Sequence, residues 1–112
     1  MEIEVKYHKD DAILRLSGDI LGDDRIMLNE KIQELADKGS KDIVLNLKEV
    51  GLMDSVGLGM IVACHTSLAR RQIRLVLSDV GKSVKYLLTI TKLAPVFELY
   101  DTEDDALASL QS

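Results

Sequence analysis

The sequence has no tryptophan, one cysteine, one proline and few aromatic residues, and each shortage excludes a class of structure or site. Aromatic residues make up 4% of the 112 residues and hydrophobic residues 46%, so we expect a core of aliphatic side chains. The single Cys64 excludes an intramolecular disulfide and favours a reducing compartment. Two histidines and no Cys-x-x-Cys pair leave no spacing typical of zinc ligands. We therefore expect no metal and no cofactor.

Long apolar runs and clustered positive charge are also missing. No stretch approaches the roughly 20 apolar residues of a membrane helix, and the segment Met1 to Glu4 lacks the basic and apolar parts of a signal peptide. The net charge of -5 argues against nucleic acid and against an anionic membrane surface as partners. We expect a cytoplasmic protein without membrane insertion, made of a single domain of residues 1–112, whose partner is a basic protein.

Hydrophobic periodicity predicts alternating strands and helices along the chain. The expected strands are a hairpin of residues 3–7 and 12–17, followed by residues 43–47, 73–77 and 96–100. The expected helices are one that contains Leu28 to Ala36 and ends at Gly39, one that ends near Arg71, and two at residues 84–91 and 102–110. This order predicts an α/β fold: a mixed, mostly parallel sheet of about five strands with an N-terminal β-hairpin and about four packing helices.

The most informative motif is Asp54-Ser55-Val56-Gly57-Leu58-Gly59, between a predicted strand and a predicted helix. Ser55 is expected at or near the first helical position, exposed and close to free backbone N–H groups, where a phosphate is well accommodated. Ser55 is equally suited to a structural role as the N-cap. Asp54 is an alternative N-cap, or orients the Ser55 hydroxyl. Glycines early in a helix cost about 1 kcal/mol each. Gly57 and Gly59 therefore suggest that another backbone or a bulky catalytic group approaches Ser55 closely.

The helix after Ser55 is predicted to have two different faces. One face is assigned to the core. The opposite face carries apolar side chains, whereas a helix that packs on a sheet normally presents charged side chains to water, so this face is predicted to be a docking surface for a partner. The predicted core face contains Leu58, Ile61, Val62, His65 and Ala69, and the predicted docking face contains Val56, Met60, Ala63, Cys64, Ser67 and Arg71.

Three enzymatic or phosphate-transfer interpretations fail on spacing. Ser55 and His65 are ten residues apart on one helix, or roughly 15 Å, which is too far for a nucleophile and its base. Gly81-Lys82-Ser83 lacks the earlier glycine of a phosphate-binding loop. A phospho-aspartate receiver needs an aspartate after its third strand, where Lys48 stands. We therefore expect no catalytic residues and no enzymatic activity.

The stretch from Ile43 to Gly59 resembles the anti-sigma factor antagonists, the stand-alone STAS domains of bacterial partner-switching systems. The turn Leu16-Ser17-Gly18-Asp19 and the closing segment 96–107 are similar to that family as well. The resemblance implies that an anti-sigma factor serine kinase phosphorylates Ser55 and that a serine phosphatase reverses the modification. It also implies that the unphosphorylated form binds the anti-sigma factor and so frees the sigma factor.

Val56 stands where many members of that family carry a second Ser or Thr, which leaves Ser55 as the one local acceptor. The alternative function is a structural STAS subunit of a larger stress-signalling or membrane-transport assembly, in which Ser55 only caps the helix. The residues expected to contact the partner are Asp54, Ser55, Val56, Gly57, Gly59, Met60, Ala63 and Ser67.

Overall fold

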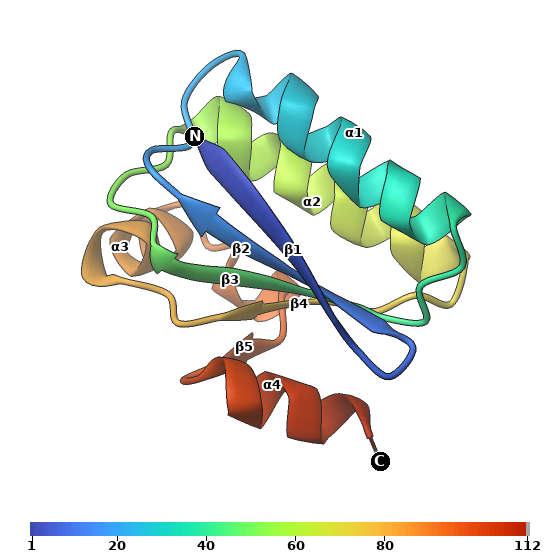
Figure 1. Ribbon diagram of the computed structural model, residues 1–112. Helices are drawn as coiled ribbons and strands as arrows, with labels where there is room; N and C mark the ends of the chain where they lie inside the picture. Colours follow the sequence, from blue (N-terminus) through green and yellow to red (C-terminus); the bar gives the residue numbers. More distant parts are fainter. Residues whose placement is uncertain (112) are drawn as a thin grey trace.

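The computed structural model describes residues 1–111, which form a five-stranded sheet with helices on both of its faces (Figure 1). The elements in chain order are β1 (Glu2–His8), β2 (Asp11–Ser17), α1 (Asp24–Asp37), β3 (Ile43–Glu49), α2 (Ser55–Arg70), β4 (Leu75–Ser78), α3 (Lys82–Ile90), the 3₁₀ turn η1 (Ala94–Val96), β5 (Leu99–Tyr100) and α4 (Glu103–Leu110).

The strands lie in the spatial order β1-β2-β3-β4-β5. β1 and β2 are antiparallel and form the predicted hairpin, whereas the pairs from β2 to β5 are all parallel. Parallel neighbours place their carboxyl ends at the same edge of the sheet, so the loops that follow β2 and β3 meet there. The predicted fold class is therefore confirmed.

The central strands are nearly continuous apolar runs because both of their faces are covered. In β3, the side chains of Ile43, Leu45 and Leu47 belong to the large core beneath α1 and α2. Val44 points to the other face, where it packs with Ala106 of α4. Figure 1 shows α1 and α2 side by side on one face of the sheet and α4 on the opposite face.

The sequence signals for the ends of helices are present in the structure. Gly39 follows the α1 cap residue with φ +98°, a left-handed conformation that glycine adopts without strain. Thr102 caps α4, and its hydroxyl accepts a hydrogen bond from the Asp105 amide at 3.0 Å. These contacts confirm the predicted stop of α1 and the predicted start of α4.

Three predicted details of the strands are wrong. Residues 96–100 were expected to form one strand, but Pro95 lies in the 3₁₀ turn and β5 is reduced to Leu99–Tyr100. The fourth strand is Leu75–Ser78 rather than residues 73–77. Tyr7 was expected on the buried side of a half-buried strand, and it is 63% exposed because it lies near the end of an edge strand.

Among the described residues, no helix has the length and hydropathy needed to cross a membrane. Residues 1–111 also hold no group of three or more His, Cys, Asp or Glu side chains placed to bind a metal ion.

Candidate functional site

The candidate site lies where the loop after β2 and the loop after β3 meet at one edge of the sheet. Ile20 and Met53 form an isolated parallel bridge, in which the Ile20 amide donates to the Leu52 carbonyl at 2.9 Å and the Asp54 amide donates to the Ile20 carbonyl at 3.2 Å. The Leu52 amide in turn donates to the Asp19 carboxylate at 3.1 Å. These bonds set the position and direction in which α2 begins.

Asp54 is the N-cap of α2, as one of the two interpretations predicted. Its carboxylate accepts a hydrogen bond from the Gly57 amide at 2.7 Å and a second from the Gly22 amide at 2.8 Å. These two bonds, the first being the stronger influence, hold the pKa of the Asp54 carboxyl below its ordinary value. The same side chain therefore starts the helix and ties the two loops together.

Ser55 is the first residue of α2, and its side chain is exposed. The position at or near the start of a helix is therefore confirmed. Among residues 1–111, the Ser55 hydroxyl has no hydrogen-bond partner, and the Asp54 carboxylate accepts from the Gly22 and Gly57 amides instead. The predicted alternative in which Asp54 orients this hydroxyl does not occur. Ser55 is not the N-cap either, so the structural role weighed for it belongs to Asp54.

The two glycines of the motif differ in their surroundings. Gly57 is buried, and a Cβ at this position would lie 3.0 Å from Ile20 Cγ2 and 3.1 Å from the Ile20 carbonyl oxygen. The close approach that Gly57 allows therefore comes from another backbone, that of Ile20 in the same chain, and the contact of Gly57 with a partner stays a prediction. Gly59 is exposed, with open space where a Cβ would stand.

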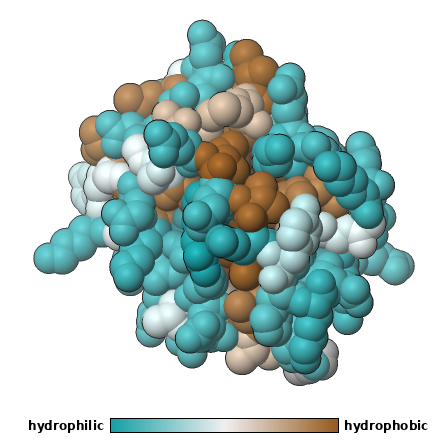
Figure 2. Space-filling model, viewed as in Figure 1, coloured by the Kyte–Doolittle hydropathy of each residue, from teal (hydrophilic) through white to brown (hydrophobic). Residues whose placement is uncertain are grey.

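Several exposed apolar side chains lie in α2 and in the two loops next to Ser55. Val56, next to Ser55, is 50% exposed, and Leu52, three residues before it, is 53% exposed. Leu21 precedes the glycine bound by Asp54 and is 44% exposed. Figure 2 shows apolar atoms at the upper left of the view, over the start of α2 and the loop before it. Leu21 and Leu52 were not identified from the sequence, since single apolar residues in loops carry no periodic signal.

The rotation of α2 differs from the prediction at two positions. Cys64 was expected on the docking face and is 2% exposed, with its thiol donating to Asn29 Oδ1 at 3.1 Å because α1 covers that side. Ala69 was expected in the core and is exposed, whereas Leu68 fills the core at 0% exposure. Helix α2 is covered by both the sheet and α1, so its buried stripe is turned toward Cys64.

The remaining predicted docking residues lie at the surface to different degrees. Ala63 is exposed, and Met60 and Ser67 are half-buried. Met60 packs against the core, and the Ser67 hydroxyl donates to the Cys64 carbonyl at 3.2 Å. With Val56, these residues form a strip along α2 that begins beside Ser55. We call Leu21, Leu52, Val56, Met60 and Ala63 the apolar strip.

Neither Cys64 nor His65 forms a reactive group with Ser55. Burial raises the pKa of the Cys64 thiol, which disfavours the reactive thiolate. The His65 ring packs edge-on against Phe97, with ring centroids 5.4 Å apart. Both side chains therefore serve packing.

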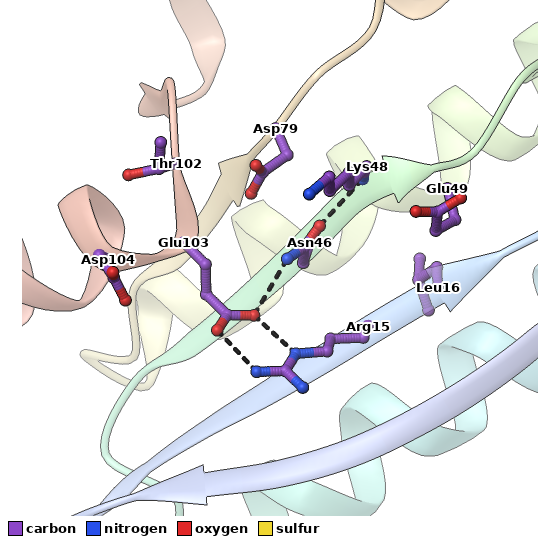
Figure 3. Close-up of a pocket in the computed structure, with 9 residues that line it drawn as sticks. All are labelled: Arg15, Leu16, Asn46, Lys48, Glu49, Asp79, Thr102, Glu103 and Asp104. Carbon is purple, nitrogen blue, oxygen red and sulfur yellow. Dashed lines mark hydrogen bonds and ion pairs between the residues drawn. The ribbon is translucent and has the colours of Figure 1, made fainter.

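Away from Ser55, a hollow of about 430 Å³ lies on the α4 side of the sheet (Figure 3). Three of its polar side chains are paired with one another: Glu103 accepts from Arg15 at 2.9 Å and from Asn46 at 3.0 Å. Arg15 is the main cause that holds the pKa of the Glu103 carboxyl below its ordinary value. This network joins α4 to β2 and β3, so these three side chains have a structural role.

The comparisons with known proteins identify the family and the fold. A family model described as the STAS domain matches residues 2–106. The anti-sigma F factor antagonist of Paenibacillus polymyxa is 30% identical over 112 residues, which cover 99% of this chain and 96% of that protein.

Solved structures extend the similarity to the fold. The anti-sigma factor antagonist SpoIIAA in its unphosphorylated form superposes with a TM-score of 0.84 at 20% identity, covering 98% of this chain and 96% of that one. The phosphorylated form of SpoIIAA from Bacillus gives a TM-score of 0.75 at 19% identity, with coverage of 97% and 99%.

Proposed function

Because the chain belongs to the STAS domain family, we propose that it acts as an anti-sigma factor antagonist in a partner-switching system. In its unphosphorylated form it binds an anti-sigma factor that is also a serine kinase, and the sigma factor held by that protein is released. The kinase phosphorylates Ser55 and ends the interaction, and a serine phosphatase restores it. The observation that carries this proposal is the exposed, unbonded hydroxyl of Ser55 at the first position of α2.

The chain supplies a phosphoryl acceptor and no catalytic group. Ser55 Oγ attacks the γ-phosphorus of ATP bound to the kinase, ADP leaves, and a base of the kinase takes the hydroxyl proton. Such a transfer needs an acceptor that the kinase can reach. An exposed serine at a helix start, without a hydrogen bond to any of residues 1–111, meets that requirement.

The binding surface we propose combines the apolar strip with the polar start of α2. Its members are Leu21, Leu52, Asp54, Ser55, Val56, Gly59, Met60, Ala63 and Ser67. Apolar side chains at the centre supply the area that a partner buries, and the Asp54 carboxylate favours a basic rim on the partner.

A phosphate on Ser55 changes this surface more than it changes the fold. The group adds a charge of about -1.5 to -2 beside the carboxylate of Asp54. The positive end of the α2 dipole stabilises an anion at this place, so the helix is expected to persist. A partner that packs over a neutral hydroxyl must instead bury or displace a dianion, and a loss of ~3 kcal/mol weakens binding more than a hundredfold.

Labelling with the partner kinase and ATP, followed by peptide mapping, tests this function. The label is expected on Ser55 and is expected to disappear in Ser55→Ala. Ser83→Ala is a matched control, because Ser83 is also an exposed serine in the first turn of a helix. Label that persists on Ser55→Ala would contradict the proposed switch and favour a structural STAS subunit.

A further inference from the structure

The strand β1 forms one edge of the sheet and leaves part of its backbone without a partner. β1 pairs with β2 along its whole length, from Glu2 opposite Ser17 to His8 opposite Asp11. In the part of the chain that the structure describes, no other strand lies on its far side. An edge of seven residues is long enough to pair with another strand.

The register determines which backbone groups of β1 point outward. The Ala12 amide donates to the Asp42 carbonyl, on the β3 side of β2, at 3.0 Å. Ala12 and its opposite residue Tyr7 are therefore a non-hydrogen-bonded pair, and the hydrogen-bonded pairs are those next to it in the ladder. The amides and carbonyls of Ile3, Val5 and Tyr7 consequently face away from β2. Among residues 1–111, these groups have no backbone partner.

The side chains of β1 alternate between an apolar and a charged row. Ile3 and Val5 pack half-buried against the main core, and Tyr7 follows them on the same side with 63% of its surface exposed. Figure 2 shows apolar atoms in the middle of the view, where β1 crosses the molecule in Figure 1. Glu4 and Lys6 belong to the opposite row, where Glu4 lies 3.2 Å from Arg15 of β2.

The charges of β1 match those of a second copy in one antiparallel register. With the two-fold axis at Val5, Glu4 of each copy faces Lys6 of the other, and Ile3 faces Tyr7. Glu2 faces His8 at the ends. In this register all three outward residues of each strand form hydrogen-bonded pairs, so every free group of the edge is satisfied.

The neighbouring registers place like charges together. Moving the axis to Glu4 sets the two copies of Glu4 opposite each other, and moving it to Lys6 sets the two copies of Lys6 opposite each other. Each shift also places one outward residue opposite a residue outside β1: Tyr7 faces Met1 when the axis is at Glu4, and Ile3 faces Lys9 when it is at Lys6. Like charges directly opposite across a strand pair are destabilising.

We propose that β1 is a self-association edge, at which two copies of this chain pair through Ile3, Val5 and Tyr7 into one continuous antiparallel junction with the axis at Val5. The interaction does not depend on the proposed switch at Ser55. A contact limited to one strand and its side chains is smaller than a standard stable interface, so the dimer is reversible and concentration-dependent.

Sedimentation velocity over a concentration series tests the dimer. We expect the wild-type chain to change from monomer to dimer between micromolar and millimolar protein. The Lys6→Glu variant has glutamate at both positions 4 and 6 of β1, and the Glu4→Lys variant has lysine at both positions. Each variant alone is expected to dimerise at least about tenfold more weakly than the wild type.

A mixture of these two variants is the decisive sample. Every central charge in the mixed dimer again faces its opposite, so the mixture is expected to associate nearly as strongly as the wild type. Melting curves of each variant control for folding, since Glu4→Lys also removes a surface ion pair with Arg15. A wild type that stays monomeric at millimolar concentration, or a mixture that does not recover association, would overturn the proposal.

Val5→Pro provides an independent test through the backbone. Proline removes the outward amide of Val5 and leaves the hydrogen bonds to β2 intact, a placement that edge strands tolerate. This variant is expected to keep its melting transition and lose the dimer. Unchanged dimerisation of a folded Val5→Pro protein would exclude β1 as the contact. If Val5→Pro does not fold, the mixture of the Glu4→Lys and Lys6→Glu variants still tests the edge.

Discussion

Gly57 packs directly against Ile20, so close that a Cβ on Gly57 would stand 3.0 Å from Ile20 Cγ2 and 3.1 Å from its carbonyl oxygen. Ile20 is completely buried, and its own backbone bridges to Met53. The contact locks the first turn of α2 against the loop after β2. The exposed hydroxyl of Ser55 is thus held on a rigid support, which suits a surface that a partner reads by shape.

Gly57→Ala is expected to lower the free energy of unfolding by about 1–2 kcal/mol, because the new methyl group meets buried backbone that cannot move aside cheaply. Gly59→Ala is the matched control, since a Cβ there meets nothing within 4 Å. It is expected to stabilise the chain by about 0.5–1 kcal/mol through helix propensity alone. Urea denaturation measures both, and equal effects of the two substitutions would contradict this account of Gly57.

Val56→Glu is expected to abolish partner binding with little effect on folding. Val56 is 50% exposed, and a carboxylate in the first turn of α2 is favourable for the helix. The same carboxylate inside the proposed interface is a buried, unpaired charge. Calorimetric titration with the anti-sigma factor measures the loss.

Tyr86→Glu is the control for this surface, because Tyr86 is an apolar side chain of α3 that is 67% exposed. It carries the same change of charge and is expected to bind normally. Equal losses from Val56→Glu and Tyr86→Glu would show that net charge, and not the apolar strip, governs the interaction.

Asp11→Asn is expected to raise the melting temperature by a few degrees at neutral pH. Asp11 is 2% exposed, and its Oδ1 atom has no hydrogen-bond partner among the described residues. Burial, and after it the nearby charge of Asp42, raises the pKa of the Asp11 carboxyl above its ordinary 3.8.

The pH dependence follows from the sign of that shift. As pH rises above 3.8, the unfolded chain loses the Asp11 proton before the folded chain does, so folding becomes less favourable until the raised folded-state pKa is passed. The gain from Asp11→Asn is therefore expected to be full at neutral pH and to vanish below pH 3.8. Asp10→Asn, at an exposed position in the same turn, is expected to show no such gain.

The fold was predictable from the sequence because the strands are short apolar runs between clear helix signals. Ile43 to Leu47 is apolar at four of five positions since both faces are covered, and Thr102 and Gly39 mark helix ends by local chemistry. The position of Ser55 was predictable for the same reason. The residue that packs against Gly57 was not predictable, because the contact with Ile20 joins residues 37 positions apart in sequence.

The rotation of α2 about its axis could not be predicted from the sequence, because this helix is apolar on more than one side. Periodicity finds the buried stripe only where the other side is polar. Cys64 and Ala69 were misassigned since the covering by α1 is a tertiary contact with no local signal. Leu21 and Leu52 join the apolar strip through the bridge between Ile20 and Met53, which is also non-local.

The most direct test of the phospho-switch is a calorimetric comparison of two forms of this chain, one with Ser55 and one with authentic phosphoserine at that position, titrated with the same anti-sigma factor. Circular dichroism of both forms first establishes that the helix content is unchanged, as the favourable helix terminus predicts. The account predicts that the unmodified form binds and that the phosphorylated form binds more than a hundredfold more weakly. Equal affinity of the two forms would contradict it.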